Sequence, residues 1–166
     1  IVAATSAIAG EYARQVSKIN PVHFTLIGRN KNQLDQQAKD LTVRNPECLV
    51  DVISGDLESP DFVSTVKKSM VHEAQIDVVL IAQGSLPNQE LVETSPVNLA
   101  KSLSINATSP AMFADAFAEK MSQQTQKSVI AIIGSVAGDR GRKSNYAYGA
   151  AKSFVQAFSR GLQHRL

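Results

Sequence analysis

The segment IVAATSAIAG, residues 1–10, decides the fold, because it combines a strand, a turn and the start of a helix. Ile1 to Ala3 form an apolar strand end, and a helical pattern begins at Ala7 after two hydroxyl residues. The same unit recurs along the chain, so apolar runs alternate with helical patterns. This alternation predicts an α/β fold with a doubly wound parallel sheet.

The expected elements follow from the two hydrophobic periodicities. Strands are expected at residues 1–3, 22–27, 49–54, 76–82 and 128–134, several of them continuous apolar runs typical of strands covered on both faces. Helices are expected at about residues 7–19, 31–43, 60–73, 96–121 and 145–166. Asn30, Ser59 and Ser95 stand where N-caps are expected, the last two before a proline at the first helical position.

Length and composition favour one domain over residues 1–166. The chain has 166 residues, 43% of them hydrophobic, and a net charge of +2, so neither a nucleic-acid surface nor an anionic membrane is indicated. No apolar run approaches the roughly 18 to 20 residues of a membrane span, and we expect a cytoplasmic enzyme or binding protein. The single cysteine, Cys48, cannot form an internal disulfide and is expected to be a small, partly buried thiol without a function. Both ends look cut, since the chain opens inside a strand and closes inside a helical pattern.

The first turn is the usual phosphate site of an open α/β sheet, because free N–H groups and the helix dipole favour an anion there. A dinucleotide loop uses glycines at this turn, and this chain has Ala3, Ala7 and Ala9. Ala3 conflicts with the loop if its position needs a positive φ. Thr5 and Ser6 supply hydroxyls that bind phosphate oxygens or only cap the helix.

The end of the second predicted strand, residues 22–27, bears on cofactor choice. An acidic residue there binds a ribose 2′-hydroxyl, whereas an arginine attracts a 2′-phosphate. This chain has Gly28, Arg29 and Asn30, so NADP is favoured over NAD if a nicotinamide cofactor binds; Arg29 is otherwise a solvated charge. Asp56 after the third strand either accepts from an adenine amino group or forms a turn.

The run from Ser144 to Ser153 holds the candidate chemistry. Tyr148 and Lys152 are four residues apart, on one face of a helix, so the ammonium favours the anion of the phenol. Ser135 stands thirteen residues before Tyr148, at the end of an apolar run. Tyr146 has Ala150 as its fourth neighbour and no ammonium beside it. The alternative for Tyr148 and Lys152 is an ordinary amphipathic helix.

A second argument concerns Asn106, which precedes Pro110 by four residues. Proline has no N–H, so the carbonyl of residue 106 loses its helical partner and the helix is expected to kink. The freed carbonyl would hold a water that returns a proton toward Lys152. The alternative is a buried asparagine bonded to a neighbouring strand.

Taken together, these residues resemble the short-chain dehydrogenase/reductase family. The likeness runs from the loop at residues 3–9 through Gly28-Arg29, Asp56-Leu57 and Ala82-Gln83-Gly84 to Asn106, Ser135 and Tyr148-xxx-Lys152. The family's TGxxxGxG motif appears here as Ala3-xxx-Ala7-x-Ala9, and its NNAG motif as Ile81-Ala82-Gln83-Gly84. Residues 134–149 are similar to a branch that includes reductases of polyprenyl-phosphate keto-sugars.

The resemblance implies a Rossmann fold, NAD(P)H chemistry on a small carbonyl or alcohol substrate, and missing C-terminal strands with the substrate segment. The expected catalytic residues are Asn106, Ser135, Tyr148 and Lys152, with Tyr148 as proton donor, Lys152 on the nicotinamide ribose and Ser135 on the substrate oxygen. No metal site is expected. The residues expected to bind the cofactor are Thr5, Ser6, Ala7, Ile8, Arg29, Asp56, Leu57, Ala82, Gln83, Gly84, Tyr148 and Lys152.

Three points stay open at this stage. The alanine-containing loop suits a dinucleotide-binding or scaffold protein without catalysis, and the Tyr-xxx-Lys pair also suits a sugar-nucleotide epimerase or dehydratase of the extended branch. The last two long helices are apolar on more than one side. This pattern indicates either a thick core or a homodimer or homotetramer interface.

Overall fold

The computed structural model describes residues 1–70 and 75–166, and it has four named strands. The strands are β1 (His23–Gly28), β2 (Leu49–Ser54), β3 (Val78–Ile81) and β4 (Val129–Ile132). The helices are α1 (Ala7–Ile19), α2 (Lys31–Arg44), α3 (Pro60–Ser69), α4 (Gln89–Glu93), α5 (Pro96–Leu103), α6 (Ser109–Met121) and α7 (Tyr146–Gln163). A π-helical turn at Ser104–Thr108 joins α5 to α6, and a 3₁₀ turn at Val136–Gly138 precedes α7.

All strand pairings are parallel, and Val2 holds the sheet together. β1 pairs with β2, and β3 pairs with β4. Val2 makes parallel bridges to Ile27 on one side and to Ile81 on the other. The resulting order is β2, β1, the Val2 segment, β3 and β4, and the predicted parallel α/β sheet is confirmed.

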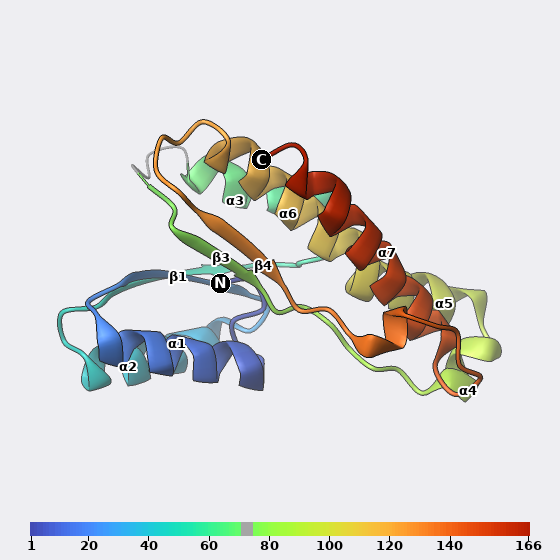
Figure 1. The fold of residues 1–166 in the computed structure, drawn as a ribbon. Coiled ribbons are helices and arrows are strands. Elements are labelled where there is room, and N and C mark those ends of the chain that lie inside the picture. The colour runs from blue at the N-terminus through green and yellow to red at the C-terminus, as the bar shows by residue number, and fades with distance from the viewer. Residues whose placement is uncertain (71–74) are drawn as a thin grey trace.

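Helices cover both faces of this sheet (Figure 1). α1 and α2 lie on one face, where Leu26, Leu34 and Leu41 form a buried core. α3, α6 and α7 lie on the other face, where Phe113 and Phe117 pack with residues of the sheet. The doubly wound architecture therefore follows from strands that are apolar on both sides.

Element bounds differ from the predictions mainly at the ends. The first predicted strand is reduced to the bridge at Val2, and the strands predicted at 76–82 and 128–134 are shorter. The helix predicted at 60–73 ends at Ser69, and its residues 71–73 lie outside the described residues. α4 was not predicted, since a five-residue helix is too short to show a periodicity.

Two of the three predicted N-cap residues make a side-chain hydrogen bond to the start of their helix. The side chain of Asn30 accepts from Gln33 N, and that of Ser59 accepts from Phe62 N. Ser95 stands at the N-cap of α5 but makes no side-chain cap bond, so that prediction was wrong about the bond.

The long helix predicted at 96–121 is interrupted at the place that Pro110 indicates. The π turn at Ser104–Thr108 contains Asn106, and the N–H of Ser109 bonds to the carbonyl of Ser104, five residues back. Proline removes one N–H from the helical ladder, and a wider turn takes up the change. The irregularity therefore lies where the missing N–H of Pro110 predicts it.

The last helix, predicted to be apolar on more than one side, places its apolar residues partly in the core and partly on the surface. Ala151 and Val155 are buried, whereas Phe154 is 45% exposed and stacks on Phe158 with ring centroids 6.0 Å apart. Ala150 and Ala157 are also exposed. α7 therefore has one face in the core and a second apolar face that the described chain leaves uncovered. Among the described residues, no helix has the length and apolar character needed to cross a membrane.

The turn before α1 contains a strained residue. Ala3 has a φ of 57°, and it is the non-glycine residue with a positive φ in the described part of the chain. The turn is closed by a bond from Ser6 N to the carbonyl of Ala3. The conflict expected between alanine and this loop is therefore present in the structure.

Replacing Ala3 with glycine is expected to stabilise the fold, because glycine adopts a positive φ without a Cβ clash. A left-handed L residue costs roughly 1–2 kcal/mol, and the greater freedom of glycine in the unfolded chain offsets part of this. We expect the free energy of unfolding to rise by about 0.5–1 kcal/mol, measured by denaturant unfolding.

Ala7→Gly is the matched control, because Ala7 is exposed at the first position of α1. There the same substitution is expected to lower the free energy of unfolding by about 0.5–1 kcal/mol. If both substitutions lowered stability equally, the strain at Ala3 would have no energetic consequence.

Candidate active site

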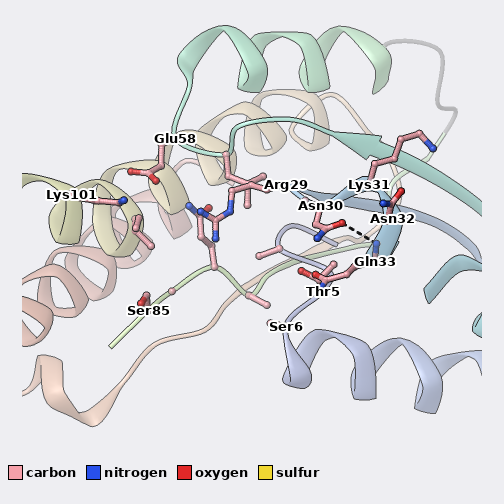
Figure 2. Close-up of a pocket in the computed structure, with 17 residues that line it drawn as sticks. Thr5, Ser6, Arg29, Asn30, Lys31, Asn32, Gln33, Glu58, Ser85 and Lys101 are labelled. Carbon is pink, nitrogen blue, oxygen red and sulfur yellow. Dashed lines mark hydrogen bonds between the residues drawn. The ribbon is translucent and has the colours of Figure 1, made fainter. Parts of the chain in front are cut away.

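A hollow of about 970 Å³ opens at the carboxyl ends of the strands. Figure 2 shows Lys101, Glu58 and Ser85 on one side of it, and Asn30, Lys31, Asn32, Gln33 and Thr5 on the other. Arg29 projects between these two sides (Figure 2). In open α/β sheets the crevice beyond the strand ends, on either side of the first strand, is where ligands bind.

Seven of the predicted cofactor residues line this hollow, namely Thr5, Ser6, Arg29, Leu57, Ala82, Gln83 and Gly84. Ala7, Ile8, Asp56, Tyr148 and Lys152 do not line it. The Asp56 carboxylate instead accepts the N–H of Glu58, so this residue forms the turn that was the alternative interpretation. Glu58 and Lys101 line the hollow and were not predicted, because nothing in their local sequence marks them.

The turn that leads into α1 lines the hollow through Thr5 and Ser6, and the first N–H groups of the helix follow it directly. The Ser6 hydroxyl accepts from Ala9 N, so this side chain caps the helix. The N–H groups of Ala7 and Ile8 have no acceptor in the described part of the chain. Thr5 is exposed at the same turn. This helix start therefore has the free donors and the dipole that an anion needs.

Lys152 is buried on α7, with 1% of its surface exposed. Its Nζ donates to the carbonyl of Ile133, just after β4, at 2.9 Å. The same Nζ lies 5.7 Å from the centroid of the Tyr148 ring. Burial lowers the pKa of the Lys152 ammonium below its ordinary value, because desolvation disfavours the charged form. The two residues predicted to share a helical face are thus in contact.

Gly84 connects this pair to the hollow. A Cβ added to Gly84 would lie 3.3 Å from Asn106 Oδ1 and 3.3 Å from Lys152 Nζ, so both polar groups converge on its backbone. Gly84 also lines the hollow. Any larger residue at this position would displace the lysine or the asparagine.

Asn106 is fully buried and uses its side chain differently from the expected carbonyl role. Its Oδ1 accepts from Ser85 N at 2.8 Å, and its Nδ2 donates to the carbonyl of Ser102 at 3.0 Å. The side chain thus fixes the segment that follows β3. The alternative interpretation expected a buried asparagine bonded to a neighbouring strand; the burial is present, and the partners lie in a loop and in α5. The predicted water relay through its main-chain carbonyl stays a prediction.

Ser135 begins the 3₁₀ turn before α7. Its Oγ accepts from Ala137 N at 3.1 Å, which leaves the O–H free to donate. Gln156 on α7 donates to the carbonyl of Ser135 at 3.1 Å, and Ser153 donates to the carbonyl of Gly138. Two side chains of α7 therefore hold this turn, and neither was predicted.

Two glycines allow the turn to contact the helix backbone directly. A Cβ on Gly149 would lie 2.6 Å from the carbonyl oxygen of Ala137. A Cβ on Gly138 would lie 2.9 Å from main-chain atoms of Lys152 and Ser153. Ser135, Tyr148 and Lys152 thus belong to one closely packed unit.

A model of the short chain dehydrogenase family matches residues 1–166, and the chain belongs to this family. An uncharacterized oxidoreductase of Mycobacterium tuberculosis is 26% identical over 164 residues, which are 97% of this chain and 64% of that protein. A short-chain dehydrogenase from Sphingobium yanoikuyae in complex with NADPH is 26% identical, with a TM-score of 0.81; the match covers 100% of this chain and 64% of that one.

A short chain dehydrogenase/reductase from Burkholderia phymatum in complex with NAD has a TM-score of 0.89 at 20% identity, over 100% of this chain and 58% of that one. At this identity the likeness concerns the fold alone. The chain spans less than two thirds of the length of these three relatives. The predicted family and the predicted Rossmann-like fold are confirmed.

Gly149→Ala is expected to lower the free energy of unfolding, because the new Cβ meets the carbonyl of Ala137. Gly161→Ala in the same helix is the matched control, since a Cβ there has no atom within 4 Å. Helix propensity alone makes the control more stable by about 0.5–1 kcal/mol. Denaturant unfolding of both variants checks this, and an equal gain at the two positions would contradict the close contact.

Proposed function

We propose that the whole protein is an oxidoreductase that transfers a hydride between NADP(H) and a carbonyl or alcohol substrate, with Tyr148 as general acid/base. The observation that carries the proposal is the buried ammonium of Lys152 between the Tyr148 ring and Gly84. Burying a lysine costs solvation energy, and an ordinary amphipathic helix has no reason to bear that cost.

The hollow suits a dinucleotide. The unpaired N–H groups of Ala7 and Ile8 provide donors for phosphate oxygens. Gly84 leaves open the space that a Cβ would fill beside Lys152. Arg29, Lys31 and Lys101 line the hollow together with one carboxylate, Glu58, so its lining carries net positive charge.

A preference for NADP is supported by Arg29. This guanidinium is exposed at the end of β1, it projects into the hollow, and neither residue beside it is acidic (Figure 2). Guanidinium groups bind phosphate oxygens through two parallel hydrogen bonds. A 2′-phosphate on the adenosine ribose is the group that Arg29 would bind.

The proton chemistry belongs to three side chains. In reduction the Tyr148 O–H bond breaks and the proton goes to the substrate oxygen, while in oxidation the phenolate takes the proton of the alcohol. Ser135 orients that oxygen with its free O–H. When bound, the nicotinamide supplies or accepts the hydride.

Lys152 supports the phenolate and the ribose. An ammonium has three N–H donors, and one of them is used on the carbonyl of Ile133. No other acceptor for Nζ is present among the described residues. The remaining donors are available to ribose hydroxyls and to the Tyr148 oxygen. Negative charge on that oxygen also opposes the effect of burial on the ammonium.

A non-catalytic dinucleotide-binding protein is the alternative that one observation favours. Ala3 holds a strained φ of 57° where the family uses glycine, so cofactor binding must tolerate a Cβ at the turn. Against this alternative, a scaffold has no use for a buried Lys152 beside a phenol. Cofactor binding and turnover, both measured on the wild-type protein and on the same variants, distinguish an oxidoreductase from a non-catalytic dinucleotide-binding protein.

Tyr148→Phe in the whole protein is expected to abolish NADPH-dependent ketone reduction, by about 10²-fold or more, because the proton donor is lost. NADPH binding, followed by quenching and blue shift of its fluorescence, is expected to change little. Tyr146→Phe is the matched control, since Tyr146 is exposed and lacks an ammonium beside it. Normal turnover in Tyr148→Phe would contradict the assignment of Tyr148 as general acid/base. NADPH binding without turnover by wild type would favour the non-catalytic dinucleotide-binding protein, and absence of any cofactor binding would favour a scaffold.

Arg29→Ala is expected to weaken NADPH binding about tenfold, the effect of one charge-assisted contact, and to leave NADH binding nearly unchanged, because NADH has no 2′-phosphate. Calorimetry with both cofactors measures this difference. Arg160→Ala, on the exposed surface of α7, is the control of equal charge change. If the affinities for NADPH and NADH fell by the same factor, Arg29 would not be the group that binds the 2′-phosphate.

A further inference from the structure

The helix that carries Tyr148 starts without a cap of its own. Asn145 occupies the N-cap position of α7, but its side chain makes no cap bond, and its Oδ1 is buried without a partner in the described chain. The first intrahelical bond runs from Gly149 N to Asn145 O at 2.8 Å. Tyr148 therefore lies in the first turn, where backbone N–H groups need partners from outside the helix.

One such partner comes from α4. Gln89 is the first residue of α4 and is buried, with 7% of its surface exposed. Its Oε1 accepts the N–H of Ala147 at 3.2 Å, in a buried contact between residues 58 positions apart. Ala147 directly precedes Tyr148. Gln89 thus does for α7 what a local Ser, Thr, Asp or Asn does for most helices.

The orientation of this amide follows from its partner. A flipped Gln89 amide would place an N–H group against the N–H of Ala147, so Oε1 must face the helix. Its Nε2 is buried and has no acceptor in the described chain. The Nε2 group of Gln89 makes no hydrogen bond, so the bond that this buried side chain forms is the one that Oε1 accepts from Ala147 N.

Gln89 also completes a strap between the two halves of the candidate site. The strap, residues 84–89, is fixed at its start by the bond from Ser85 N to Asn106 Oδ1. It is fixed at its end by Gln89 on the first turn of α7. α4 and the start of α7 lie at the same end of the molecule (Figure 1). The position of Gly84 is thereby linked to the position of Tyr148.

We propose that Gln89 is a positioning residue for Tyr148: it holds the first turn of α7 so that the phenol keeps its place beside Lys152. The catalytic meaning of this position rests on the proposed function. The positioning itself does not, and it is testable without turnover.

The test compares Gln89→Met with Gln89→Glu in the whole protein. Methionine keeps the length and bulk of glutamine without the acceptor, whereas glutamate keeps an oxygen for Ala147 N and removes the unsatisfied N–H. Amide hydrogen exchange of Ala147 is expected to become about tenfold faster or more in Gln89→Met. In Gln89→Glu it is expected to stay within about threefold of wild type.

A second readout follows the phenol directly. The protein is labelled with 3-fluorotyrosine, and the ¹⁹F resonance of Tyr148 is assigned by its loss in Tyr148→Phe. In Gln89→Met this resonance is expected to move or broaden, while that of Tyr12 on α1 stays in place. Gln36→Met, on the exposed face of α2, is the matched control and is expected to move neither.

In an active enzyme, Gln89→Met is also expected to lower kcat by about 10- to 100-fold, the effect of a small misplacement, with unchanged NADPH binding and with rescue by Gln89→Glu. If Gln89→Met fails to fold, Gln89→Asn replaces it, because its shorter side chain also withdraws the acceptor. An unmoved Tyr148 resonance with unchanged Ala147 exchange in a folded variant overturns the proposal. A failure of the proposed function appears instead as turnover that survives Tyr148→Phe.

Discussion

The buried ammonium of Lys152 is the group around which the candidate site is arranged. A charge removed from water needs nearby polar partners, and here the carbonyl of Ile133 is the one that the described chain provides. This bond ties α7 to the end of β4. Gly84 must be small because the ammonium and Asn106 both approach it. Gly138 must be small because the main chain at Lys152 passes beside it. The position of one lysine thus limits residue size at Gly84 and at Gly138, which lie on two separate segments.

The fold could be predicted from the sequence to a large extent, because its elements have strong periodicities. α1 and β2 have the predicted bounds, and the parallel pairings follow from strands that are apolar on both faces. The π turn was located by the missing N–H of Pro110. The first strand was overestimated, since its regular pairing is limited to Val2. α4 escaped prediction because its five residues are too few to define a face.

The candidate site could be predicted where chemistry is local and not where it depends on tertiary contact. The Tyr148 and Lys152 pair follows from helical spacing, and the structure places the two side chains in contact. The roles of Gln89, Ser153 and Gln156 depend on which main-chain groups lie opposite them, and no spacing in the sequence encodes this. Asn106 shows the same limit, because its backbone was considered and its side chain is what binds Ser85.

The π turn between α5 and α6 has a consequence for the surface of the molecule. One additional residue in a helical turn rotates all later side chains by about 100° around the axis. The residues before the turn therefore need not follow the stripe that α6 presents to the core. Ser102 is the buried residue of α5, whereas α6 buries eight residues, Phe113 among them. The two parts of this long helical segment therefore differ in how much surface they bury, and the change occurs at the π turn of Ser104–Thr108.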